Sequence, residues 1–154
     1  MAGWVGLVAS LGLVGLVAFG GSRFRPSDWY YALAKPSWNP PAFVFAPVWT
    51  LLYILMAIAA WLVWARAGSS AGGPLVLYLV QLALNVTWSW LFFGRHHIGL
   101  ALLDLVALWA VLLVTTILFW QIRVLAGVLL VPYLAWVSFA GALNFSIWRL
   151  NRRS

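Results

Sequence analysis

The chain has 154 residues, of which 66% are hydrophobic and 7% are charged, and its mean hydropathy is +1.02. A soluble domain usually carries about a quarter charged residues, so this composition excludes a water-soluble globular protein. The absence of cysteine excludes disulfides, iron–sulfur clusters and covalently attached c-type haem. The formal net charge is +7, but the basic residues are scattered at the ends of apolar runs, which favours contacts with lipid headgroups over a nucleic-acid surface.

Five apolar runs each reach the length of about 20 residues that a helix needs to cross a bilayer. The expected helices cover residues 2–22, 40–66, 74–94, 98–121 and 124–149 of a single domain, residues 1–154. The first run lacks a basic start and is expected to be a retained helix, not a signal peptide. The predicted fold is therefore an all-α integral membrane protein, a bundle of five transmembrane helices.

The first connection, residues 23–39, is the one that is long enough to hold structure of its own. With five spans, this loop and the C-terminus share one side of the membrane with most of the basic residues, namely Arg23, Arg25, Lys35, Arg95, Arg149, Arg152 and Arg153. Only Arg66 and Arg123 fall on the other side. The positive-inside rule therefore predicts a cytoplasmic first loop and C-terminus and an external N-terminus. A cytoplasmic membrane is favoured, and a bacterial outer membrane stays open.

The segment "KPSWNPPAFVFAPVWTLLY" joins this loop to the second helix. Asn39 is predicted to cap that helix, with Pro40 and Pro41 in its first turn, where missing amide donors cost little. Pro47 removes a backbone hydrogen bond and is predicted to bend the helix near Trp49. The proline-rich loop thus reads as a stiff cover for the bundle, and we call residues 23–39 the lid loop.

One face of the third helix carries a line of side-chain amides and aromatic rings. Gln81, Asn85, Trp88 and Phe92 are spaced by four, three and four residues and so share one helical face. Polar groups at membrane depth must be satisfied by protein or ligand. Two interpretations stay open at this point: the amides join neighbouring helices, or they contact a ligand.

The fifth helix repeats this arrangement. Tyr133, Trp136, Ala140 and Asn144 share one face, and Pro132 predicts a kink beside them. A similar aromatic pair, Trp49 and Tyr53, follows Pro47 in the second helix. Two proline-associated pairs favour an internal aromatic site over a belt at the membrane interface.

The remaining polar residues give weaker signals. Asp104 is expected to pair structurally, with a proton or cation site as the alternative, and His96 and His97 are expected at a solvated interface. Lys35 is the only lysine and lies in a loop, which argues against a Schiff base inside the bundle. No nucleophile and base are arranged for hydrolysis, and two acids cannot form a metal cluster, so no catalytic residue, metal or required cofactor is predicted.

Several blocks together resemble the TspO/MBR family, also called translocator protein, tryptophan-rich sensory protein or peripheral benzodiazepine receptor. They are "WYYALAKPSWNPP", "PVWTLLY", "QLALNVTWSWLFFG", "ALLDL" and "VPYLAW…ALNFSIWRLN", which extend from about Trp29 to Asn151. The chain's 12 tryptophans suit the family's name. The resemblance, to a bacterial-type member, implies a five-helix bundle, a homodimer, and a pocket under the first loop open toward the cytosolic face.

The resemblance also implies ligands: porphyrins, with protoporphyrin IX or haem foremost, sterol-like molecules and benzodiazepine-type compounds. The family's pocket positions fall on Pro40, Trp49, Tyr53, Asn85, Trp88, Trp136 and Ala140. Trp38 is predicted as the contact made by the lid loop. Trp49 and Trp136 also match the tryptophans associated with a porphyrin breakdown proposed for some members.

The sterol-recognition stretch of animal members corresponds here to "LNFSIWR", with Leu143, Phe145 and Arg149 as its main residues. The motif's central tyrosine is missing, which argues against high-affinity cholesterol binding. The leading hypothesis is a receptor or transporter-like protein for tetrapyrroles. The alternatives are a porphyrin-degrading, photo-oxidative membrane enzyme and a ligand-independent membrane scaffold or regulator.

Overall fold

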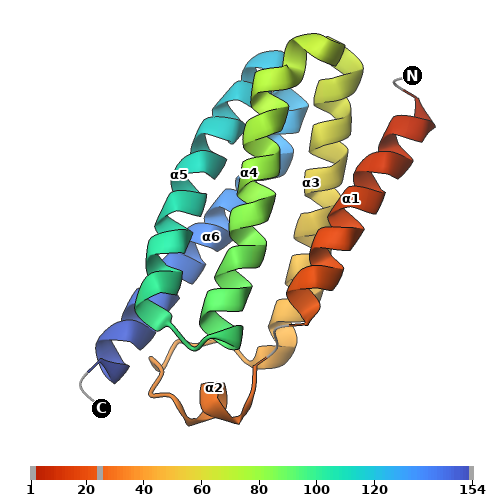
Figure 1. Ribbon diagram of the computed structural model, residues 1–154. Helices are drawn as coiled ribbons and strands as arrows, with labels where there is room; N and C mark the ends of the chain where they lie inside the picture. The colour runs from red at the N-terminus through yellow and green to blue at the C-terminus, as the bar shows by residue number, and fades with distance from the viewer. Residues whose placement is uncertain (1–2, 24–25, 153–154) are drawn as a thin grey trace.

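The computed structural model describes residues 3–23 and 26–152, and its five long helices stand side by side in one bundle (Figure 1). They are α1 (Trp4–Ser22), α3 (Phe45–Ala67), α4 (Gly72–Ser89), α5 (Ile98–Ile122) and α6 (Val124–Asn151). No strand occurs among the described residues. The all-helical bundle predicted from the apolar runs is confirmed.

The long helices are apolar enough to cross a membrane. By length and composition, Phe45–Gly94, Ile98–Ile122 and Val124–Asn151 qualify, and Trp4–Gly20 is a shorter apolar helix. The first of these stretches makes two passes, because the short 3₁₀ turn η2 (Gly68–Ala71) reverses the chain between α3 and α4 (Figure 1). Gly68 adopts a positive φ of 55° there, a conformation that glycine reaches without a Cβ clash.

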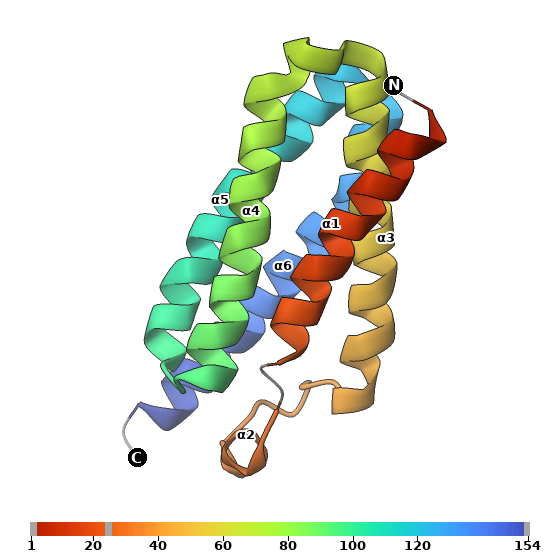
Figure 2. The ribbon, with the colours of Figure 1, turned by 45° about the vertical axis from the view of Figure 1, so that its right-hand side comes forward.

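The order of the helices in space differs from their order in sequence. α5 packs between α4 and α6, and α3 packs against α6. α1 lies outside this group, against α3 and α4, as both ribbon views show (Figures 1 and 2). Its apolar outer face is open, with Trp4 and Leu16 more than 70% exposed, as expected for side chains that meet lipid instead of water.

A continuous apolar core fills the half of the bundle farther from the lid loop. Met56, Val63, Phe119 and Leu130 are completely buried there, and Tyr78 stacks on Phe119 with ring centroids 5.9 Å apart. A second, smaller cluster lies at the other end, under the lid loop, and consists of Tyr30, Phe92, Ala101, Leu143 and Ile147 with the rings around them. The two clusters divide the bundle into a packed half and a lid half.

The lid loop contains the short helix α2 (Asp28–Ala32) and is fastened to the end of α6. The Asn151 side chain accepts a hydrogen bond from the Ala34 amide at 3.1 Å and donates one to the Ala34 carbonyl at 2.8 Å. Lys35 Nζ donates to the carbonyls of Tyr30 and Leu33 at 2.9 and 3.0 Å. The loop is thus ordered by contacts at the end of α2 and by one residue from the far end of the chain.

The start of the second long helix differs from the prediction. Residues 39–41 lack regular structure, a 3₁₀ turn η1 (Ala42–Val44) follows, and α3 begins at Phe45. The prediction that Asn39 caps this helix is therefore wrong, because α3 begins after Val44 and the Asn39 side-chain oxygen accepts no hydrogen bond among the described residues. Pro47 falls in the first turn of α3, where the amide would be unpaired anyway, so its predicted role in bending the helix is also wrong.

The end of α4 has an irregularity that the sequence did not reveal. The helix widens into a π-helical turn, η3 (Trp90–Gly94), in which the Arg95 amide donates to the Trp90 carbonyl at 2.8 Å. Such turns insert one extra residue and are frequent at functional sites. Here the extra residue allows the adjacent Phe92 and Phe93 both to face the lid half. At the other end of the bundle, α6 continues as one helix through Pro132.

Candidate aromatic cavity

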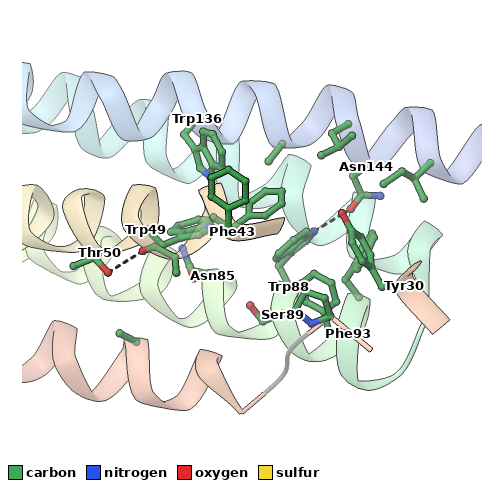
Figure 3. A pocket seen from close by; sticks show the side chains of 18 of the residues that line it. Tyr30, Phe43, Trp49, Thr50, Asn85, Trp88, Ser89, Phe93, Trp136 and Asn144 are labelled. Atoms are coloured by element: carbon green, nitrogen blue, oxygen red, sulfur yellow. Dashed lines mark hydrogen bonds between the residues drawn. The ribbon is translucent and has the colours of Figure 1, made fainter. Parts of the chain in front are cut away.

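A cavity of about 780 Å³ occupies the lid half, between α1, α3, α4 and α6 and beside the lid loop (Figure 3). Its wall is mostly rings and aliphatic groups with a few hydroxyl and amide groups. The lining residues are Ala18, Pro26, Tyr30, Tyr31, Phe43, Phe45, Ala46, Trp49, Thr50, Tyr53, Asn85, Trp88, Ser89, Phe92, Phe93, Trp136, Ala140, Leu143, Asn144 and Ile147. The size and lining fit a site for one organic ligand of moderate size.

Most of the residues predicted from the sequence meet at this cavity. Six line it, from three different helices: Trp49, Tyr53, Asn85, Trp88, Trp136 and Ala140. The other two do not. Pro40 lies in the irregular stretch before η1, and Trp38 packs its ring edge-on against Phe139 at 5.7 Å, outside the wall. The fold therefore brings the predicted site residues together, with the exception of Trp38 and Pro40.

A chain of hydrogen bonds joins the helices at the deep end of the cavity. Tyr53 donates to Asn85 Oδ1 at 2.9 Å, and Asn85 Nδ2 donates to the Tyr133 hydroxyl at 2.9 Å. Tyr133 in turn donates to Gln81 Oε1 at 2.7 Å. Every member gives or receives a bond, so α3, α4 and α6 are held in register by groups that hydrocarbon cannot satisfy. Of the two interpretations of the α4 stripe, the structure thus shows the helix-joining one directly.

A second polar link lies closer to the lid loop. The indole of Trp88 donates to Asn144 Oδ1 at 2.9 Å, and Asn144 Nδ2 donates to the Ile98 carbonyl at 3.1 Å. This link fixes the Trp88 ring, which also stacks on Phe92 with centroids 5.3 Å apart. Asn144 is 1% exposed and ties α4 to the start of α5 through α6. The ring and the amide line the cavity with their polar atoms already paired.

Four rings form a compact cluster on the wall opposite the lid. The Trp49 centroid lies 5.6 Å from that of Tyr53, 6.1 Å from that of Tyr133 and 6.4 Å from that of Trp136. Most of these contacts are edge-to-face, a geometry that rings with a quadrupole prefer. Such rings are rigid, so they form a firm wall and leave the cavity beside them unfilled.

One donor on this wall is unpaired. The Trp136 indole nitrogen is buried without a hydrogen-bond partner among the described residues, while its ring lines the cavity beside Phe43 (Figure 3). A buried N–H without a partner is costly, and native structures usually satisfy it. The Trp136 indole N–H is therefore free to donate a hydrogen bond to an acceptor atom of a ligand.

Rings of the lid loop form part of the wall at the outer end of the cavity. Tyr30 is 4% exposed and lies 5.5 Å from Phe93 between ring centroids. Burial raises the pKa of the Tyr30 phenol, a shift opposed by a hydrogen bond from Asn39 and aided by the neighbouring Tyr31. The Trp29 ring stacks on His96, with centroids 4.0 Å apart, and so joins the lid loop to the turn between α4 and α5.

Several lining residues were not anticipated from the sequence. Tyr30, Phe43, Phe45 and Ile147 all line the cavity. Ile147 follows Ala140 and Asn144 by helical spacing, so extension of the α6 stripe would have identified it. The lid residues had no such signal, since a loop has no period that shows which side chains face inward.

Of the weaker candidates, Asp104, His96, Phe145 and Arg149 lie away from the cavity wall. Asp104 Oδ2 is buried without a hydrogen-bond partner among the described residues, and the ring of His96 is committed to Trp29. In the sterol-like stretch, Leu143 lines the cavity, whereas Phe145 is 44% exposed and lies under the guanidinium of Arg149. The three motif residues thus face two different environments. No cluster of three metal-ligating side chains occurs in the described part of the chain.

The chain matches the model of the TspO/MBR family over residues 5–149. It is 46% identical to the protein CrtK of Rhodobacter capsulatus over 133 residues, which cover 85% of this chain and 83% of that protein. It is 45% identical over 152 residues to the tryptophan-rich protein TspO of Chlorobaculum tepidum, covering 94% of this chain and 95% of the relative.

The similarity extends to animal proteins. The human translocator protein is 44% identical over 142 residues, which cover 88% of this chain and 84% of the human protein. The match thus includes all five long helices and the lid loop. Together with the apolar helical bundle, this shows that the chain is a membrane protein and that it belongs to the TspO/MBR family.

Proposed function

We propose that this protein is a membrane receptor or transporter-like protein that binds tetrapyrroles such as protoporphyrin IX, and related flat apolar ligands, in the aromatic cavity. The observation that carries the proposal is the cavity itself: about 780 Å³, walled by indole and phenyl rings from the bundle and the lid loop. Organic ligand sites typically measure about 300–1,000 Å³ and are mostly apolar with few polar groups. Relatives named translocator protein and tryptophan-rich sensory protein support a role in transport or sensing.

The chemistry of the wall suits a flat conjugated ring system. Trp49, Trp88 and Trp136 offer indole faces to a macrocycle, and stacking of large rings adds to the gain from burying apolar area. The bond to Asn144 fixes the Trp88 ring, and the chain through Asn85 fixes the Tyr53 and Tyr133 rings that pack against Trp49. A preorganised wall loses little conformational entropy on binding, which favours affinity.

The direct test is titration of protoporphyrin IX into the purified protein in lipid nanodiscs, followed by quenching of tryptophan fluorescence. We expect saturable binding in the low-micromolar range or tighter. Trp136→Ala removes a wall ring and should weaken binding about tenfold or more, as truncation of a central aromatic contact usually does. Asn85→Ala breaks the chain that positions Tyr53 and Tyr133 and should also weaken it.

A matched control is Trp64→Ala. Trp64 is 41% exposed on α3 and does not line the cavity, so its loss should leave the dissociation constant unchanged. Unchanged binding in both Trp136→Ala and Asn85→Ala would show that the ligand binds elsewhere. A complete absence of thermal stabilisation by saturating porphyrin would instead favour a ligand-independent scaffold, because a ligand that prefers the folded state must stabilise it.

One arrangement favours a second candidate function, photo-oxidative breakdown of the bound porphyrin. Trp49 and Trp136 lie edge-to-face on the cavity wall with centroids 6.4 Å apart, close enough for both indoles to border one ligand. The oxidant would be dioxygen, with the porphyrin as reductant. Under illumination in air, the porphyrin spectrum should bleach faster with the protein than with empty nanodiscs. Bleaching at the same rate in the Trp136→Phe variant would argue against this function.

We further propose that the lid loop faces the cytoplasm, because the basic residues are concentrated at that end of the bundle. The cysteine-free chain makes this simple to test. Ser37→Cys places a thiol in the lid loop, and Ser70→Cys places one in the opposite turn. Membrane-impermeant maleimide added to intact cells should label Ser70→Cys but not Ser37→Cys, and the reverse pattern would invert the topology.

A further inference from the structure

The polar groups deep in the cavity are already engaged with one another. Both polar atoms of the Asn85 amide are hydrogen-bonded, to Tyr53 and Tyr133, and both of the Asn144 amide are bonded, to Trp88 and Ile98. Apart from the unpaired but neutral indole N–H of Trp136, a ligand carboxylate placed beside these amides would have to break one of these links to find a donor. An ionised group buried in an apolar site without strong partners is very costly.

The described lining residues are uncharged, so the inner wall holds no cation that would offset this cost. Protoporphyrin IX carries two carboxylates on one edge of an otherwise apolar macrocycle. The ring system suits the wall, whereas the acidic edge does not. The acidic edge is therefore expected at the outer end, where the cavity meets water and lipid headgroups.

The mouth of the cavity lies at the lid end, where lining residues are open to the outside. Tyr31 is 59% and Phe43 is 78% exposed, although both line the cavity. Ala18 near the end of α1 and Pro26 at the start of the lid loop also line it. Arg23 lies between these two residues in the chain, immediately after α1, and its side chain is exposed. Arg23 therefore belongs to the chain segment on the α1 side of the mouth, although it does not form part of the cavity wall.

The other described lysine and arginine residues at this end make different contacts, whereas Arg25 and Arg153 lie outside the described residues. The Lys35 ammonium donates to carbonyls at the end of α2 and lies 4.8 Å above the Tyr30 ring. Three arginines lie over aromatic rings away from the cavity wall, namely Arg95 over Trp90, Arg149 over Phe145 and Arg152 over Trp148. Among the described residues at this end, Arg23 is therefore the arginine that is left to pair with an acidic ligand.

We propose that Arg23 selects for acidic ligands: the cavity takes the apolar macrocycle, and Arg23 pairs with carboxylates that remain at the mouth. This inference rests on the proposed porphyrin site and assigns the orientation of the ligand in it. Arg23 is a specificity residue and is not needed for the ring system to enter. A neutral ligand of the same shape binds without it.

The experiment compares protoporphyrin IX with its dimethyl ester, which has the same macrocycle and no carboxylate charge. Both are titrated into wild-type protein and into Arg23→Gln in zwitterionic lipid nanodiscs. An exposed ion pair contributes modestly, so Arg23→Gln should weaken binding of the acid by about two- to fivefold. Binding of the ester should stay within experimental error. Raising the salt concentration should weaken binding of the acid to wild-type protein, because exposed charges are screened.

Two variants serve as controls. Arg123→Gln removes an exposed arginine at the opposite end of the bundle, between α5 and α6, and should affect neither ligand. Arg23→Lys keeps the charge and should restore most of the affinity for the acid. Because Arg23 is exposed, none of these changes is expected to disturb folding, and thermal unfolding of each variant checks this.

The possible results separate the inference from the proposed function. Loss of acid binding alone in Arg23→Gln supports the inference. Equal losses for acid and ester, or no loss for either, overturn the role of Arg23 while the porphyrin site stands. If neither porphyrin binds the wild-type protein, the proposed function fails and this inference fails with it.

Discussion

The packed half and the lid half of the bundle are built from the same helices but use different side chains. In the packed half, aliphatic and small residues such as Met56, Val63 and Leu130 interdigitate with no exposed area left. In the lid half, large rings meet edge-on around a cavity of about 780 Å³. The lid half also differs in its backbone, since its α4 ends in a π-helical turn and a loop replaces regular packing.

This difference shows how one bundle combines a close-packed base with an open cavity. Flexible aliphatic chains adapt to one another and reach crystal-like packing density, which gives a rigid base. Rings are stiff, and when hydrogen bonds such as that of Trp88 to Asn144 fix them, they cannot collapse into the space between them. The packed half therefore carries most of the stability, and the lid half can keep an open cavity. The predictions below test this division.

The largest expected effect is a loss of stability caused by a substitution in the packed half. Leu130 is completely buried near the start of α6, and Leu130→Ala should lower the free energy of unfolding by ~2–5 kcal/mol, through lost apolar contacts and the cavity that remains. Thermal unfolding in nanodiscs measures the loss. Porphyrin affinity of the folded protein should be unchanged, and a parallel loss of affinity would show that the two halves are coupled.

A smaller effect is expected where α6 begins and packs against the end of α5. A Cβ built on Gly127 would lie 2.6 Å from Trp120 Cβ and 2.7 Å from its Cα, which forces the backbone to move. Gly127→Ala should therefore cost ~1–3 kcal/mol of stability, as overpacking usually does. Gly12→Ala is the matched control, because its Cβ would meet nothing within 4 Å. Similar melting temperatures for the two variants would contradict the assignment of Gly127 to a tight contact.

The third prediction concerns a substitution that should loosen the lid half and leave the packed half unchanged. Asn151→Ala removes both hydrogen bonds to Ala34, worth about 1 kcal/mol each, and should release the lid loop from α6. Amide hydrogen exchange in residues 29–38 should accelerate, and porphyrin should dissociate several-fold faster, with little change in the melting temperature. Ser37→Ala, an exposed change in the same loop, should do neither. Slow exchange in Asn151→Ala would mean that the lid loop is held by other contacts.

The smallest effect is expected at the edge of the cavity. Trp38 is 47% exposed and contacts Phe139, which lies behind Trp136. Trp38→Ala should change the dissociation constant for protoporphyrin IX by no more than about twofold, because peripheral contacts contribute little. An effect as large as that of Trp136→Ala would show that the lid loop closes further on the ligand and brings Trp38 onto it.

The sequence predicted the helices better than it predicted their ends. The apolar runs identified all five long helices, since hydrocarbon permits only segments that satisfy their own backbone. The start of α3 was misplaced because Pro40 and Pro41 fit either a helical first turn or an extended approach, and local preference cannot choose between them. The π-helical turn at Trp90 had no signal, because an extra residue in a helix changes neither the composition nor the apolar run from which the helix was predicted.

The stripes on α4 and α6 were readable because helical period puts Asn85 with Trp88, and Trp136 with Ala140, on one face whatever the fold. The sequence by itself therefore determined the membrane class, the number of long helices and most of the inner wall. Only the tertiary structure decided the remaining features. They are the pairing of the Asn85 amide with the Tyr133 hydroxyl, the position of Tyr30 in the lid loop, and the position of Trp38 outside the cavity wall. These features depend on how three helices and a loop approach one another, and no local period or propensity encodes a distance between segments far apart in the chain.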